Sequence, residues 1–319
     1  MMDWTDRHCR TFHRQLTRHA LLYTEMVTAP AVLHGDRDRL LAYAPVEHPL
    51  ALQLGGSVPG ELAEATRIAR QAGFIEVNLN VGCPSDRVQS GCFGAALMLR
   101  PELVADCVTA MIEAAGALPV TVKCRIGVDD QNPEQVLPAF LETMARAGVS
   151  RIAVHARKAW LKGLSPKENR EIPPLDHALV VRMAAAFPEL RLTINGGITD
   201  LDMAEHFLAC GLKGAMIGRA AYHTPAILAE VDRRIFGEPG PDPRPEDAVR
   251  AMLPYIEAER SRGTGLHAVT RHMLGIFHGR PGARAWRRML SEEAHLPGAG
   301  PELVERALAE VAALPTAAE

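Results

Sequence analysis

The chain has 319 residues, of which 47% are hydrophobic, and a formal net charge of −3, so it can hold one large and one smaller domain and has no global basic signature for binding nucleic acid. Its six cysteines form neither a C-x-x-C pair nor a zinc spacing, which predicts that no metal is bound. Because we find neither a signal peptide nor an apolar run that could span a bilayer, we expect a protein of the reducing cytoplasm.

Short apolar runs recur along the first two thirds of the chain, and a helix-like segment follows each of them. Continuous apolar runs are typical of strands that are buried on both faces, as in a parallel sheet. Amphipathic stretches such as 59–73 and 133–148 lie between them, and Gly73 and Gly148 are natural helix stops. The predicted strands cover residues 21–27, 50–56, 74–82, 120–127, 151–156, 191–197 and 214–220.

The strand count is one short of the eight that a (β/α)8 TIM barrel needs. The chain opens on a turn and a helix predicted over residues 6–18, so strand one is the missing element. Either the barrel closes differently or, as we expect, the native protein begins upstream. A seven-stranded doubly wound sheet is the alternative fold. Polar residues stand at the carboxyl ends of many predicted strands, and this arrangement favours the barrel.

The last third of the chain has a different pattern. A proline-rich break covers residues 238–247, and no strand signal follows it. Helical patterns cover residues 245–261, 265–278, 282–294 and 301–313. We therefore predict an α/β barrel domain at 1–237 and a helical domain at 238–319 that folds as a four-helix bundle.

The stretch from Asn78 to Gly94, NLNVGCPSDRVQSGCFG, places a thiol at the end of a predicted strand. Gly82 allows close approach of the backbone, and Pro84 stiffens the turn. Barrel enzymes keep their chemistry at these strand ends, where Cys83 would be a nucleophile or a proton donor. Cysteine is also among the most buried residue types, so a buried thiol without chemistry is the competing interpretation.

Several other strand ends carry polar groups, which a barrel brings to one face. The last two predicted strands end in glycine-bearing pairs, Gly196-Gly197 and Gly218-Arg219, which indicate a phosphorylated cofactor, because backbone N–H groups there commonly bind phosphate. Lys123 fits a Schiff-base lysine, a cation beside an electron-rich cofactor ring, or a side chain that reaches solvent at the barrel mouth. The other strand-end residues are Gln53, Asn78, Asn80, Arg125, His155 and Asn195.

Two basic segments suggest a polyanionic partner. The loop 156–174 gathers five basic residues around Trp160, among them Lys167 and Arg170. From Arg262 to Arg288 there are six arginines and no acidic residue, and Arg284 and Arg287 share one helix face. Such a run is either a solvated helix face or a nucleic-acid platform, and the lack of a compensating carboxylate leaves both open.

Taken together, several motifs resemble the tRNA-dihydrouridine synthases, in particular the A-type subgroup that acts on D-loop uridines 20 and 20a. They are DWTDRHCR, YTEM, QLGG, NLNVGCPSDRVQ, VTVKCRIG, HARKAWLKGLSPKENREIPPL, INGGI and GRAAYHTP, with RHMLGIFHGRPGARAWRRMLSE in the helical region. The resemblance implies an FMN-dependent enzyme that reduces the C5–C6 bond of uridine in tRNA with NADPH as reductant. It also implies a monomer that needs neither a metal nor a membrane.

The resemblance assigns roles to individual positions. Cys83 matches the active-site proton donor, and an ordinary thiol is suitably protonated at neutral pH. The residues that match FMN contacts are Met1, Met2, Gln53, Lys123, His155, Asn195, Gly196, Gly197, Gly218 and Arg219. The residues that match tRNA-facing positions are Asn80, Lys167, Arg170, Arg284 and Arg287.

Two other functions fit parts of the pattern. One is a flavin-dependent reductase of a small pyrimidine or enone, which would need neither the basic loop nor the helical domain. The other is a non-catalytic tRNA-binding protein, which would not need Cys83, Lys123 or the glycine pairs. The chain also departs from the family at one point, because the family places a strand ending in Ala-Pro before the methionine that matches Met1.

Overall fold

The computed structural model describes residues 1–84 and 93–312. The chain divides into two units, and the first combines Met1–Leu22, Tyr43–Pro49 and Arg219–Glu319. The second combines Tyr23–Ala42 with Leu50–Gly218. The division falls after Gly218, and the domain boundary after Gly237 stays a prediction from the sequence. The segment before the first strand is grouped with the C-terminal helices.

Seven strands form one sheet in the order β1-β2-β3-β4-β5-β6-β7, and the pairs from β2 to β7 are parallel. All seven predicted strands are thus confirmed, and so is the α/β, TIM-barrel-like class. The sequential order excludes a doubly wound sheet, in which the strand order reverses. The strands are β1 (Leu22–Thr28), β2 (Leu50–Gly55), β3 (Glu76–Val81), β4 (Val120–Arg125), β5 (Arg151–His155), β6 (Arg191–Asn195) and β7 (Gly214–Met216).

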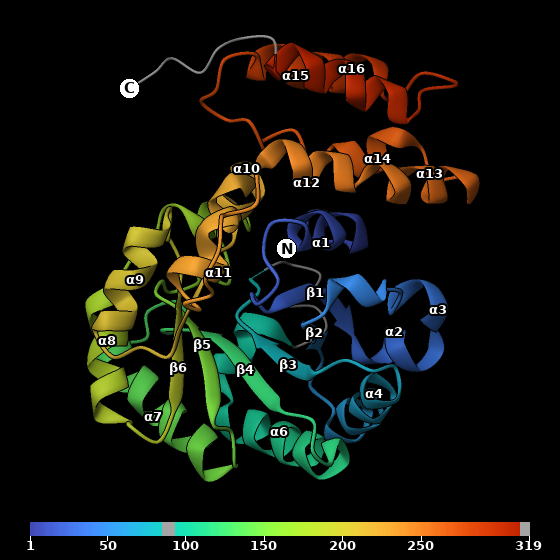
Figure 1. The fold of residues 1–319 in the computed structure, drawn as a ribbon. Coiled ribbons are helices and arrows are strands. Elements are labelled where there is room, and N and C mark those ends of the chain that lie inside the picture. Colours follow the sequence, from blue (N-terminus) through green and yellow to red (C-terminus); the bar gives the residue numbers. More distant parts are fainter. Residues whose placement is uncertain (85–92, 313–319) are drawn as a thin grey trace. The chain divides into compact units, whose positions relative to one another are not determined.

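Helices alternate with the strands and lie along the outside of the curled sheet (Figure 1). Aspartates cap three of them, since Asp36, Asp176 and Asp200 accept hydrogen bonds from Arg39 N, Leu179 N and Met203 N, respectively. Because the strands are parallel, their carboxyl ends meet at one edge of the sheet. The helices are α2 (Ala29–His34), α3 (Arg37–Leu40), α4 (Pro59–Gln71), α6 (Pro101–Ala115), α7 (Pro133–Arg146), α8 (His177–Ala186) and α9 (Leu201–Ala209), with 3-10 turns η2 (Gly94–Leu99) and η3 (Glu168–Arg170).

The other unit is helical. The predicted helix 245–261 is interrupted, because Pro254 has no N–H to donate and occupies the first turn of a new helix. The predicted segment 265–278 keeps only a short helix, while the last two predicted helices are confirmed and pack against each other (Figure 1). The elements are α1 (Arg7–Arg14), η1 (Pro45–Glu47), α10 (Arg219–His223), η4 (Pro225–Glu230), α11 (Val231–Arg234), α12 (Pro245–Ala251), α13 (Leu253–Ser261), α14 (Leu266–Thr270), α15 (Ala283–Glu293) and α16 (Pro301–Ala312).

Ion pairs explain why α1 is grouped with the C-terminal helices. Asp6 caps α1 and also pairs with Arg271 at 2.6 Å and His272 at 3.0 Å. Burial alone would raise the pKa of Asp6, but the hydrogen bonds and charges of His272 and Arg271 hold that pKa well below its usual range. Arg10 of α1 forms a buried ion pair with Glu47 at 2.6 Å. None of the described helices is long and apolar enough to span a membrane.

Candidate active site

Side-chain amides at the carboxyl ends of β2 and β3 form one hydrogen-bonded network. Gln53 lies opposite Asn78 in the sheet register, and its Nε2 donates to Asn78 Oδ1 at 2.9 Å. Asn80 Nδ2 in turn donates to Gln53 Oε1 at 2.8 Å. Asn78 is fully buried and Asn80 nearly so, so the network fixes the orientation of all three amides. The structure therefore brings together three of the strand-end residues singled out in the sequence.

Cys83 follows directly on β3, and its backbone is anchored to this network. Asn80 Oδ1 accepts hydrogen bonds from Gly82 N at 3.0 Å and Cys83 N at 2.9 Å, while Cys83 O accepts one from Ala95 N at 2.9 Å. Cys83 is half-buried, and none of the described cysteines forms a disulfide. Residues 85–92, which belong to the same motif, lie outside the described residues. Asn80 thus positions the thiol in addition to any role toward a substrate.

Lys123 on β4 lies opposite Asn80 in the sheet register. Its side chain is half-buried, and its ammonium makes no hydrogen bond or ion pair with any residue that the structure describes. Burial, together with the positive charge of Arg125, lowers the pKa of Lys123 to about 8. A charge held in such a place without an acceptor is costly, so this position is suited to a ligand that supplies one.

Arg125, two residues further along β4, has only 3% of its surface exposed. Its Nε donates to Gly82 O at 3.1 Å, and its Nη1 donates to Lys158 O at 3.1 Å and Asn169 O at 2.9 Å. Burial lowers the pKa of Arg125 to about 10, although Cys83 acts in the opposite direction. In the sequence this arginine is recognisable only as a strand-end residue without an assigned role.

At the carboxyl ends of β5 and β6, His155 lies beside Gly196. His155 lies opposite Asn195, whose Nδ2 donates to Met216 O at 2.8 Å. Gly196 has φ +105°, and a Cβ there would lie 2.3 Å from His155 Cδ2. Gly197 has φ +71°, so both positions favour glycine, and the histidine ring packs against a backbone that carries no side chain. Gly218 follows β7 and is half-buried.

The basic loop 156–174 is folded around a residue that the sequence analysis missed. Asn169 is fully buried, its Nδ2 donates to Trp160 O at 2.9 Å and Leu164 O at 3.1 Å, and its Oδ1 accepts from Trp160 N at 2.7 Å. Lys167 and Arg170 flank it and are exposed. The only sequence signal for Asn169 is one uncharged amide inside a charged loop, which does not distinguish it from a solvated residue.

Five predicted site residues belong to the helical unit. Met1 and Met2 are exposed, and Met1 O accepts hydrogen bonds from Trp4 N and Thr5 N. The last strand was predicted to reach residue 220, but β7 ends at Met216, and Arg219 is the first residue of α10. The remaining two, both exposed on α15, are Arg284 and Arg287.

The arginine run 262–288 is of two kinds. Three of its members pair with carboxylates outside the run: Arg262 with Glu259, Arg271 with Asp6 and Arg280 with Glu246. The other three, all on α15, form no ion pair within the described part of the chain: Arg284, Arg287 and Arg288. Trp286 is fully buried and donates from Nε1 to Met273 O at 3.2 Å, so it is a core residue and not a surface aromatic.

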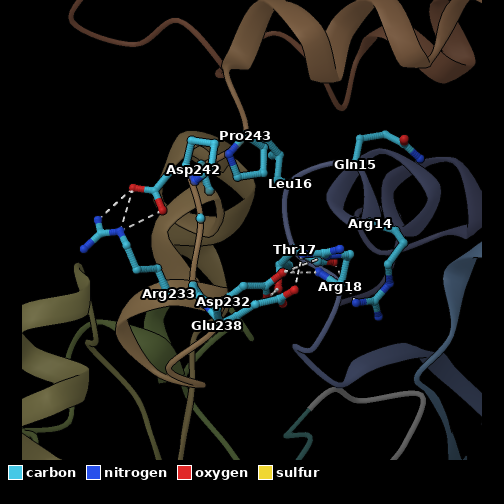
Figure 2. Close-up of a pocket in the computed structure, with 14 residues that line it drawn as sticks. Arg14, Gln15, Leu16, Thr17, Arg18, Asp232, Arg233, Glu238, Asp242 and Pro243 are labelled. Atoms are coloured by element: carbon cyan, nitrogen blue, oxygen red, sulfur yellow. Dashed lines mark hydrogen bonds and ion pairs between the residues drawn. The ribbon is translucent and has the colours of Figure 1, made fainter.

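A pocket of about 310 Å3 also lies in the helical unit (Figure 2), and no predicted site residue lines it. Its acidic groups are already engaged, since Asp232 accepts hydrogen bonds from Thr17 Oγ1 and Arg18 N at 2.6 Å each, and Glu238 pairs with Arg18. His19, Asp232 and Glu238 place three possible metal ligands within 4.8 Å of one another. Arg18 pairs with both carboxylates of this cluster, with Asp232 at 3.9 Å and with Glu238.

Comparison with known proteins gives a consistent picture. Curated tRNA-dihydrouridine(20/20a) synthases are similar over almost the whole chain. The protein from Vibrio cholerae serotype O1 is 55% identical over 312 residues, which cover 98% of this chain and 94% of that protein. The protein from Escherichia coli strain K12 is 56% identical over 313 residues, which cover 98% of this chain and 90% of that protein.

Solved structures of lower similarity show the same fold. An old yellow enzyme homologue from Zymomonas mobilis aligns with a TM-score of 0.51 and 15% identity over 75% of this chain and 85% of that chain. Morphinone reductase aligns with a TM-score of 0.51 and 15% identity over 77% of this chain and 85% of that chain. At this identity the likeness concerns the fold alone. The family model described as dihydrouridine synthase (Dus) matches residues 1–312, and with relatives more than half identical over nearly all of its length, the chain belongs to the dihydrouridine synthase family.

Proposed function

We propose that this protein is a tRNA-dihydrouridine synthase that reduces the C5–C6 bond of uridines 20 and 20a in the D-loop of tRNA, with FMN as cofactor and NADPH as reductant. The observation that supports it best is the placement of the Cys83 thiol and the Lys123 ammonium at one edge of the parallel sheet, in a chain that is 55% identical to a tRNA-dihydrouridine(20/20a) synthase. The thiol can donate a proton, and the ammonium has no acceptor among the described residues.

The donor set at this edge fits a flavin mononucleotide. The ammonium of Lys123 has no acceptor among the described residues, and a ring that gains negative charge on reduction supplies one. Gln53 keeps a second amide N–H, and His155 lies next to the backbone of Gly196. The backbone N–H groups at three strand-end glycines can bind the phosphate, and Asn195 precedes two of them: Gly196, Gly197 and Gly218. Met1, Met2 and Arg219 stay predicted flavin contacts that rest on the resemblance.

A bound flavin would supply the hydride that C6 of the uracil accepts. The product then needs one proton at C5, and the thiol of Cys83 donates it as a general acid. Asn80 contributes by holding the backbone of Cys83, since its Oδ1 accepts from the amides of residues 82 and 83. Lys123 contributes a positive charge beside the reacting groups, which stabilises negative charge as it develops.

The tRNA would be bound through phosphate contacts from exposed basic residues. Lys167 and Arg170 present cations on the loop that follows β5. Arg284 and Arg287 present them on α15, where no carboxylate of the described residues pairs with them. The target base must leave its stack to be reduced, which costs a few kcal/mol that these contacts offset. Recognition of shape and backbone, not a base code, is then the expected source of specificity.

The test is to incubate the purified protein with NADPH and unmodified tRNA and to map dihydrouridine by mass spectrometry. We expect flavin absorbance, NADPH oxidation and a mass increase of the modified base at positions 20 and 20a. Reduction of cyclohexenone or free uracil without any reaction on tRNA would instead identify a small-molecule reductase. Binding of tRNA by a colourless protein that does not oxidise NADPH would identify a binding protein without catalysis.

A further inference from the structure

One guanidinium joins the loop that carries Cys83 to the basic loop. Arg125 is nearly fully buried at the end of β4, where its Nε donates to the carbonyl of Gly82, the residue before Cys83. Its Nη1 donates to the carbonyls of Lys158 and Asn169, which both belong to the basic loop. Hydrogen bonds from a charged donor are the stronger kind, and the planar fork of arginine fixes the direction of each. The two loops are therefore tied to the same rigid group.

The basic loop is built so that a displacement at its surface reaches Arg125. Asn169 holds Trp160 and Leu164 through three hydrogen bonds to backbone atoms. Lys158 Nζ donates to Asp129 O at 2.7 Å, and Leu161 N donates to Asp129 Oδ1 at 2.7 Å. These hydrogen bonds restrain the loop at several points, which gives a displacement at its exposed side a continuous route of contacts to Arg125.

The backbone of Gly82 and Cys83 is held from two sides. The amides of Gly82 and Cys83 are held by Asn80, which is part of the sheet network. The carbonyl of Gly82 is held by Arg125, which also contacts the basic loop. The groups that hold the backbone at Cys83, which include Ala95 N, thus combine one fixed to the sheet with one shared with a loop that faces solvent.

We propose that Arg125 is a positioning residue that couples the basic loop to Cys83, so that tRNA docked on Lys167 and Arg170 sets the position from which the thiol delivers its proton. This inference rests on the function proposed above and extends it, because substrate docking and proton transfer then share one side chain. A misplacement of a reacting group by about 1 Å can cost roughly 10²-fold in rate, which is ample for a coupling of this kind.

The first experiment separates positioning from simple stabilisation. In Arg125→Met and Arg125→Lys we measure flavin reduction by NADPH and, separately, single-turnover reduction of uridine by the pre-reduced enzyme at saturating tRNA. We expect uridine reduction to fall by roughly 10²-fold, with flavin reduction and tRNA affinity nearly unchanged. Lysine should not restore the rate, since its ammonium cannot bond to three carbonyls in the same geometry.

Arg151→Met is the matched control. Arg151 begins β5, at the amino ends of the strands and thus at the opposite edge of the sheet from Arg125, and it pairs with the buried Glu76 at 3.2 Å, so its loss removes a different structural contact of the same sheet. This variant should lower stability without a selective loss of uridine reduction. If the Arg125 variants lose flavin content, flavin reduction and uridine reduction in parallel, as a damaged fold would, the inference is wrong.

A second experiment does not depend on turnover. The rate at which iodoacetamide alkylates Cys83 is followed by peptide mass spectrometry, with the exposed Cys210 as an internal reference. Asn169→Ala, which loosens the basic loop, should change the Cys83 rate several-fold in the wild-type background and much less in Arg125→Met, while the Cys210 rate stays constant. Additive effects of the two substitutions would contradict the coupling.

The two proposals fail in different ways. If the wild-type protein makes no dihydrouridine, the proposed function is wrong, whatever the alkylation rates show. If the wild type makes dihydrouridine and the Arg125 variants behave like Arg151→Met, the function stands and the coupling alone is refuted.

Discussion

The edge of the sheet and the arginine run of the helical unit look equally functional in the sequence, but their charges are held in different ways. At the sheet edge, Lys123 is half-buried without an acceptor among the described residues. In the arginine run, half of the members pair with carboxylates that stand elsewhere in the chain, such as the pair between Arg271 and Asp6. A local deficit of acidic residues therefore does not show that a charge is available to a partner.

The difference follows from how each region is built. Parallel strands must place their carboxyl ends together, so sequence order alone predicts which polar residues meet. Helical segments joined by turns carry no such constraint, and their pairing partners come from distant positions, as with Arg280 and Glu246. Two questions follow. One is whether the sheet edge carries the chemistry. The other is whether the arginines of α15, which form no ion pair within the described residues, bind a partner.

The largest effect is expected at Cys83. Replacement by alanine removes the proton for C5 but leaves the sheet network intact, so flavin content and NADPH oxidation should persist while uridine reduction falls by roughly 10²–10⁴-fold. Rapid-mixing measurement of the two half-reactions checks this. Cys210→Ala, at an exposed thiol, should leave both half-reactions unchanged. A wild-type rate of dihydrouridine formation in Cys83→Ala would remove the proton-donor role.

Asp6→Asn tests the structural half of the arginine run. The change keeps the shape of the helix cap but removes the charge that pairs with Arg271 and His272, which should lower the free energy of unfolding by about 2 kcal/mol at pH 7. The pKa of Asp6 is lowered in the folded protein, so this contribution is fully present above the unfolded pKa of 3.8 and is lost as the pH falls below it. Denaturant titrations of both proteins at pH 7 and pH 3 measure the difference, which should shrink at the lower pH.

Lys123→Met tests the sheet edge, and we expect it to lower flavin affinity but to raise the stability of the flavin-free protein. Flavin affinity should fall, because the positive charge beside the ring is gone. The flavin-free protein should become more stable by about 1–2 kcal/mol at pH 7, after allowance for partial exposure of the side chain. The pKa of Lys123 is lowered from 10.5 to about 8, so the cost of burying the ammonium is present below pH 8 and disappears as the pH rises toward 10.5. Equal stability of the two flavin-free proteins at pH 7 would show that this lysine is well solvated.

Much of the fold follows from the sequence, because a buried parallel strand has a local signature. All seven strands were predictable from apolar runs and glycine stops. The break in the first C-terminal helix was not predicted, although Pro254 signals it, because the apolar period continues across the proline. Trp286 lies among exposed arginines in the sequence, whereas its ring is in the core.

The site was predictable to a lesser degree. Strand order brings Gln53, Asn80 and Lys123 to the same edge, and no tertiary information is needed to expect this. The role of Arg125 was not predictable, since its acceptors are backbone carbonyls in two loops, and a carbonyl has no sequence signature. The role of Asn169 was not predictable for the same reason, since its hydrogen bonds are also to backbone atoms. Residues that organise backbone are identified by their partners, not by their type.

The smallest effect is expected for the charges on α15, and it decides whether this helix is a tRNA surface. Replacing Arg284 and Arg287 together with alanine removes two exposed cations that have no carboxylate partner among the described residues, so stability should hardly change. If each contacts a phosphate, affinity for tRNA should fall by about tenfold at low salt, and the slope of log affinity against log salt should decrease by roughly 1.5, because fewer counterions are released. Flavin reduction by NADPH should be unaffected.

The matched control is Arg306→Ala on α16, an exposed arginine that already pairs with Glu293 at 3.0 Å. Lys167→Ala and Arg170→Ala on the basic loop should weaken binding in the same salt-dependent way. If the α15 variant binds tRNA like the Arg306 control across a salt series, its arginines are a solvated helix face, and the tRNA is held from the barrel side.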